Sequence, residues 1–154
     1  MIFYCVFKQL IGEWKDYMAS MSRHEMRISA FLLIFERIFN NDSIENIIAL
    51  ASESEAFDIS EDSISLFKGV EEHKEILDNE ISKYLKGWAI SRISKVALVT
   101  LRIAMYEIMF CENVDTDIAI SEAVLITQTF ALKEDVSFVN GVLSSVNKDL
   151  KKEQ

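Results

Sequence analysis

Proline is absent from the sequence, and only four of its 154 residues are glycine. Both residues interrupt helices, because proline has no backbone N–H and glycine loses more backbone entropy than any other residue. Half of the residues are apolar, which is enough to build a core and too many for a disordered chain. The composition therefore predicts a single helical domain.

Cysteine, histidine and long apolar runs are also scarce. The two cysteines, Cys5 and Cys111, form no spaced framework, which favours a reducing cytoplasm over a disulfide-stapled secreted protein. The two histidines stand far apart and no metal-binding or phosphate-binding motif occurs, so we expect no metal, no cofactor and no enzymatic activity. No segment reaches the roughly 18–20 apolar residues that span a membrane, so we expect a cytoplasmic protein without a membrane segment.

Negative charge dominates, with 25 acidic residues against 16 lysines and arginines and a net charge of −9. Nucleic-acid binders usually carry a basic patch, so the charge alone counts against RNA or DNA as a partner. Residues 1–20 are neutral overall, so the whole excess of negative charge lies in residues 21–154.

A capping-box pattern marks the start of the helical domain. Ser22 and Glu25 are three residues apart, just before a run of helical periodicity, and predict a helix that begins at Arg23. Residues 1–20 show no such stripe and form an N-terminal extension. Two explanations remain open: an extra helix before the domain, or a mis-assigned start with Met21 as the true first residue.

Apolar residues recur at helical spacing through the rest of the chain. They predict helices over about 23–39, 44–51, 62–86, 95–111, 117–130 and 134–148, a loop over 52–61 and a polar tail over 151–154. The helix over 95–111 is apolar on all sides, so it should be buried at the centre. Arg102 lies within it and needs a partner, because an unpaired buried charge is very costly. We expect a structural ion pair with Glu122 on the next helix.

A cationic cluster opens the first predicted helix. Arg23 and Arg27 are four residues apart and point the same way, and His24 shares their turn. Such a cluster at an exposed helix start could hold phosphates. The alternative is an ordinary surface pair, since the helix dipole mildly disfavours cations at this end.

Three motifs occur in a fixed order: LRIAMYEI at 101–108, IAISEAV at 118–124 and FVNGVL at 138–143. They resemble the NusB family signatures LRxAxYEL, VAINEAV and FVNGVL, and the resemblance covers about residues 21–150. It implies an all-α fold, a NusB-like bundle of about six to seven helices in two packed subdomains.

The resemblance also implies an RNA-binding transcription antitermination factor. NusB proteins pair with the small-subunit ribosomal protein NusE, bind boxA RNA of ribosomal RNA transcripts and help RNA polymerase resist termination; a homodimer is a further expectation. The RNA-facing residues would be Arg23, His24, Arg27, Gln128 and Phe138. Phe138 could stack on a base, or it could belong to the core, because it precedes the inward-facing Val139.

The sequence departs from the family at several contact positions. Gln128 stands where a lysine is usual, His24 where basic residues are common, and Ala97 and Leu98 replace a charged pair on the surface implicated in NusE contact. An alternative function therefore stays open: a protein-interaction module of NusB fold with weak or no RNA binding.

Overall fold

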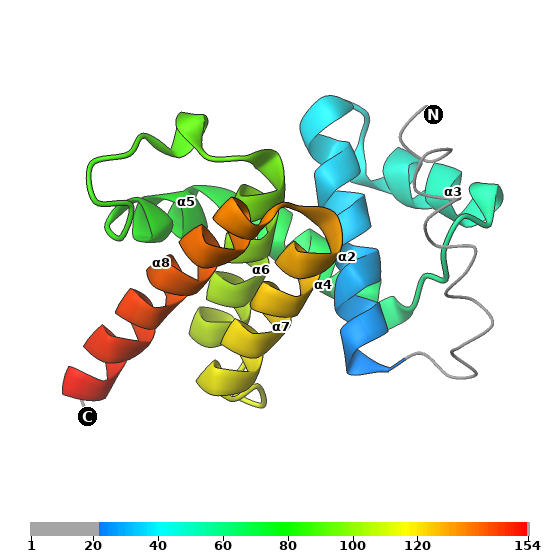
Figure 1. Ribbon diagram of the computed structural model, residues 1–154. Helices are drawn as coiled ribbons and strands as arrows, with labels where there is room; N and C mark the ends of the chain where they lie inside the picture. Colours follow the sequence, from blue (N-terminus) through cyan, green and yellow to red (C-terminus); the bar gives the residue numbers. More distant parts are fainter. Residues whose placement is uncertain (1–21, 154) are drawn as a thin grey trace. The chain divides into compact units, whose positions relative to one another are not determined.

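The computed structural model describes residues 22–153, so the predicted extension 1–20 lies outside the described residues. Seven α-helices and one 3-10 helix form the described part of the chain, which contains no strand (Figure 1). This confirms the predicted all-α class. The chain divides into two compact units, and the boundary between Lys68 and Gly69 falls inside one helix.

The first unit contains α2 (Arg23–Phe39), α3 (Ile44–Ser54) and the first part of α4 (Glu61–Glu72). Ser22 and Glu25 form the predicted capping box at the start of α2. The middle of α2, residues 29–35, is buried on every side rather than along one stripe. Phe39, the last residue of α2, is 54% exposed.

The second unit contains α5 (Lys74–Ser82), the 3-10 helix η2 (Ile90–Arg92), α6 (Lys95–Phe110), α7 (Thr116–Phe130) and α8 (Lys133–Lys152). α6 packs against α5, α7 and α8, and α7 also packs against α8 (Figure 1). Residues 97–105 of α6 are all buried, which confirms the prediction of a central buried helix.

Two buried hydroxyl groups link α6 to α7. The Oγ1 atoms of Thr100 and Thr127 lie 3.1 Å apart, and both residues are fully buried. Thr100 Oγ1 also lies 3.0 Å from the Val96 carbonyl, and Thr127 Oγ1 lies 2.7 Å from the Ala123 carbonyl. Each hydroxyl therefore has partners in its own helix as well as across the interface, as buried polar groups require.

The single long helix predicted over 62–86 is wrong, because the chain breaks at His73 between α4 and α5. His73 has φ −99° and ψ 10°, and its Nδ1 donates a hydrogen bond of 2.9 Å to the Gly69 carbonyl. α5 then ends at Ser82 and not near Gly87. Two other helices run longer than predicted: α3 reaches Ser54, and α8 reaches Lys152 in the predicted polar tail.

The N-cap of α6 gives a first testable prediction. Ser94 Oγ accepts a hydrogen bond from the Ala97 backbone N–H at 3.1 Å and satisfies one of the free donors of this helix end. Ser94→Ala should lower the free energy of unfolding by about 1 kcal/mol in urea titrations. Ser91→Ala is the matched control, because Ser91 is exposed and makes no side-chain hydrogen bond to a described residue. Equal stability changes in the two variants would contradict this role.

Candidate nucleic-acid interface

Arg23 and His24 occupy the first turn of α2, where the helix presents its unbonded N–H groups. Arg23 is exposed and His24 is half-buried. The partial positive charge of a helix N-terminus favours anions, and an exposed guanidinium adds a planar fork of donors that suits phosphate. This end of α2 can therefore hold a phosphate group, although the capping box occupies part of it.

Arg27 does not face solvent as predicted, because its side chain is buried to 3% exposure. It follows Met26 and precedes Ser29 and Ala30, which are all buried, so the buried surface of α2 continues through this position. Its Nη1 lies 3.4 Å from the Arg23 carbonyl, a long contact one helical turn back. Arg27 therefore belongs to the packed part of α2, and Arg23 is the exposed arginine of the pair.

Gln128 and Phe138 belong to the second unit, whereas the α2 cluster belongs to the first. Gln128 is exposed on α7. Phe138 is half-buried on α8, next to the fully buried Val139, so part of its ring is accessible for stacking. The structure thus brings Arg23, His24 and Arg27 together on one helix and places the other two residues on two further helices.

Arg102 makes its ion pair with Asp78 of α5, so the prediction of Glu122 as its partner is wrong. Its Nε and Nη2 each donate a hydrogen bond of 2.7 Å to the two carboxylate oxygens of Asp78. The Arg102 side chain is 5% exposed and that of Asp78 is 26% exposed. The pairing is bidentate because the flat guanidinium matches the carboxylate, and it joins α5 to α6.

Ala97 and Leu98 do not line an accessible contact surface. They are 0% and 6% exposed, so the expectation that they lie on such a surface is wrong for this chain. Both lie in the first turns of α6, whose next residues are also buried. Small and apolar side chains here extend the core toward the start of α6.

An aromatic cluster that the sequence did not reveal surrounds the α4–α5 break. The rings of His73 and Phe110 lie 4.3 Å apart between centroids, and Tyr106 lies 5.6 Å from His73 and 5.4 Å from Phe110. Burial raises the pKa of the Tyr106 hydroxyl, and Cys111 adds to the shift. One signal in the sequence could have indicated this cluster. Gly69 lies inside a helix, where glycine lowers stability, and its presence there suggests that another group approaches the backbone closely.

Two further observations concern metals and membranes. Within residues 22–153, no group of three histidine, cysteine, aspartate or glutamate residues could hold a metal ion. None of the described helices combines the length and the apolar character that crossing a membrane requires.

Comparison with known proteins places these residues in a family context. The model of the NusB family matches residues 24–148. The chain is similar to the transcription antitermination protein NusB of Oceanobacillus iheyensis, with 36% identity over 82% of this chain and 98% of that protein. It is 39% identical to the protein of the same name from Clostridium botulinum, over 83% of this chain and 99% of that one.

Solved structures agree with this relationship. The fold is similar to T. maritima NusB, with a TM-score of 0.73, 28% identity, and coverage of 84% of this chain and 92% of that one. A chain from the crystal structure of a plectonemic RNA supercoil matches with a TM-score of 0.77 and 25% identity, over 86% of this chain and 98% of that one. A chain from the crystal structure of the antitermination factors NusB and NusE in complex with dsRNA shares the fold, with a TM-score of 0.71 and 23% identity, over 82% of this chain and 96% of that one. The chain belongs to the NusB family.

Proposed function

We propose that this protein is a transcription antitermination factor that binds RNA. The observation that carries the proposal is the match to curated relatives named transcription antitermination protein NusB, which this chain covers over 98% and 99% of their length. The role of these relatives can therefore be proposed for this chain, because the chain matches nearly their whole length. The protein would act in the cytoplasm without catalysing a reaction.

The proposed partners are boxA-type RNA, NusE and the RNA polymerase antitermination complex. A chain with this fold comes from a solved complex of NusB and NusE with dsRNA, which makes NusE the partner to test first. The proposed RNA contacts are the exposed Arg23, with His24 beside it, and Gln128 and the accessible part of Phe138 on the second unit. Arg23 would bind a phosphate, and Phe138 would stack on a base.

A titration of labelled boxA RNA tests the proposal. The full chain is added to the RNA with and without NusE, and fluorescence anisotropy follows binding. Because the chain carries a net charge of −9, we expect weak binding alone and much tighter binding with NusE. A scrambled RNA of equal length is the control. Equal affinity for both RNAs, or no RNA binding with NusE present, would overturn the proposal.

The alternative, a protein-interaction module with weak or no RNA binding, is favoured by two specific observations. The chain is strongly acidic, and Arg27, one of the two arginines predicted to bind RNA at the start of α2, is buried. This alternative predicts that the chain binds NusE while the anisotropy of boxA RNA stays unchanged by its addition.

Arg23→Ala should weaken RNA binding in the presence of NusE. Loss of one exposed charged contact should cost about 1 kcal/mol, or about fivefold in affinity. The slope of log affinity against log salt should become shallower by about 0.7. Lys68→Ala is the matched control, because Lys68 is an exposed cation in the same unit. If both variants lose the same affinity, Arg23 contributes only to overall charge and makes no specific contact.

A further inference from the structure

The connection between α5 and α6 exposes a tryptophan. Trp88 is 62% exposed, although tryptophan is highly buried on average in folded proteins. It stands between two buried apolar residues, Leu85 and Ile93, which are 1% and 8% exposed and hold the two ends of the connection to the core. The exposed ring is therefore presented by an anchored segment of the chain.

A tight turn directs the chain to Trp88. Lys86 and Gly87 have φ of 49° and 89°, and the Trp88 backbone N–H donates a hydrogen bond of 3.1 Å to the Leu85 carbonyl. Positive φ at both central residues is the requirement of a type I′ turn, and Gly87 adopts it without steric cost. A second short turn follows, where the Arg92 N–H donates to the Ala89 carbonyl at 2.9 Å.

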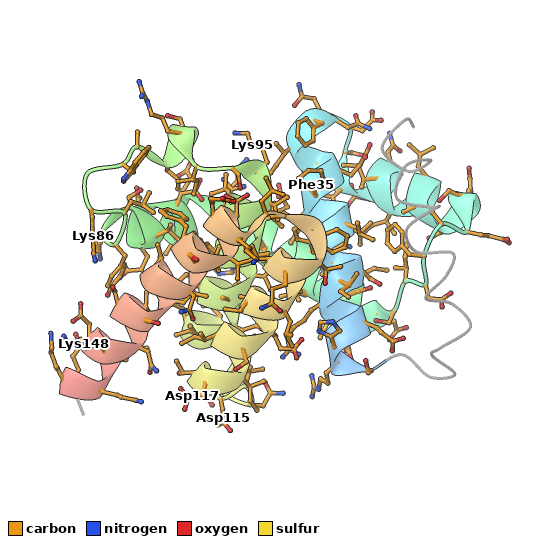
Figure 2. The ribbon with its side chains drawn as sticks, in the orientation of Figure 1. Phe35, Lys86, Lys95, Asp115, Asp117 and Lys148 are labelled. Atoms are coloured by element: carbon orange, nitrogen blue, oxygen red, sulfur yellow. The ribbon has the colours of Figure 1, made fainter. Side chains whose placement is uncertain are left out.

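Positive charge is concentrated around this ring in an otherwise acidic chain. Residues 83–95, KYLKGWAISRISK, contain four cations and no acid. Lys83 is paired with Glu80 at 2.5 Å, but Lys86, Arg92 and Lys95 are exposed and form no ion pair with a described residue. Figure 2 shows Lys86 and Lys95 toward the two ends of the connection. Burial raises the pKa of the neighbouring Tyr84, and Asp149, Glu80 and Glu153 add to the shift, so acidic groups lie near one end of this patch.

We infer that the connection over residues 83–95 is a contact site for single-stranded RNA, in which Trp88 stacks on a base and Lys86, Arg92 and Lys95 bind phosphates. Nonspecific single-strand sites combine these two elements, an aromatic platform and a cationic track. The inference rests on the proposed function for the class of ligand. It adds a site in the second unit, with residues separate from Arg23 and Phe138.

A membrane surface is the less suitable ligand. Interfacial membrane binding needs a broad apolar face beside the cations. Here Ile90 is half-buried and Leu85 and Ile93 are buried, so the ring of Trp88 is the only large apolar side chain of the connection that is exposed. One aromatic ring among cations suits a single unstacked base better than a bilayer.

Tryptophan fluorescence and affinity test the aromatic part. In the full chain with Trp14→Phe, Trp88 is the one tryptophan left, and single-stranded RNA should quench its emission. Trp88→Ala should weaken RNA binding about tenfold, whereas Trp88→Phe should keep most of the affinity because phenylalanine can also stack. Leu132→Ala, which removes a side chain that is 75% exposed in the same unit, should change nothing.

Salt dependence tests the cationic part. A triple variant should lose three phosphate contacts: Lys86→Gln/Arg92→Gln/Lys95→Gln. In this variant the slope of log RNA affinity against log salt should become shallower by about 2, at ~0.7 per phosphate. The control variant removes the same charge from three exposed lysines elsewhere: Lys68→Gln/Lys74→Gln/Lys133→Gln. It should leave the slope nearly unchanged.

Three outcomes separate this site from the proposed function. In the first outcome, Arg23→Ala weakens RNA binding, but neither Trp88→Ala nor the triple variant of Lys86, Arg92 and Lys95 does. This result overturns the inference and leaves the proposed function standing. No RNA binding by the wild type, with NusE present, overturns both. Quenching by phosphatidylserine vesicles but not by RNA also overturns the inference, because it assigns the ring to a membrane.

Discussion

Arg102→Ala is expected to lower the free energy of unfolding by about 3 kcal/mol. The substitution leaves the Asp78 carboxylate without its bidentate partner next to the core of the second unit. Breaking a fully buried pair costs about 3–5 kcal/mol, and we place this one at the lower end because the Asp78 side chain is 26% exposed. Urea denaturation of the two proteins at neutral pH gives the difference directly.

A double-mutant cycle separates the ion pair from the packing of the arginine stem. Asp78→Ala alone should also destabilise, since it leaves the guanidinium buried without an acceptor. The double variant should then cost clearly less than the sum of the two single variants. Additive costs would mean that the pair contributes nothing, and a neutral Arg102→Ala with loss of RNA binding would make Arg102 a contact residue.

Gly69→Ala should destabilise the protein by about 1–3 kcal/mol, the usual cost of overpacking a filled site. A Cβ atom at Gly69 would lie 2.2 Å from the Tyr106 hydroxyl oxygen and 2.3 Å from the ring carbon that carries it. The ring cannot move freely, because it contacts the rings of His73 and Phe110. Its displacement would disturb the whole cluster at the α4–α5 break.

The matched control is another helical glycine with open surroundings. A Cβ at Gly141 of α8 would meet nothing within 4 Å, so Gly141→Ala should stabilise by up to about 1 kcal/mol through helix propensity. In a Tyr106→Ala background, Gly69→Ala should also become stabilising, because the clash is gone. Thermal or urea unfolding of these variants measures both effects. Destabilisation by Gly69→Ala that persists without the tyrosine ring would contradict the steric explanation.

Local signals in the sequence predicted helix starts and the central helix well. The Ser22 and Glu25 spacing placed the start of α2, and the apolar run after Ser94 identified α6 as buried, since both depend on neighbours along the chain. The break at His73 was missed, and the rings that pack against His73 there, Tyr106 and Phe110, are distant from it along the chain. Helical periodicity continues through His73, and no proline or glycine stands at the break itself.

The candidate site was less predictable for the same physical reason. Arg23 and Arg27 are equivalent by spacing, yet one is exposed and the other buried, and only the packing around α2 decides between them. The partner of Arg102 could not be chosen either, because Asp78 lies 24 residues away on a helix whose limits were mispredicted. Sequence patterns name the charged residues that need a partner, but the partner depends on how helices pack.

The hydroxyl pair of Thr100 and Thr127 has a consequence for the alignment of α6 and α7. Each hydroxyl keeps an acceptor within its own helix, so the pair contributes little to stability when one partner is removed. A slide of α7 by one turn, however, would press a hydroxyl against apolar side chains across the interface. The contact between two polar atoms thus selects one alignment among several that purely apolar surfaces would accept, and keeps the helices that carry the family motifs in a single arrangement.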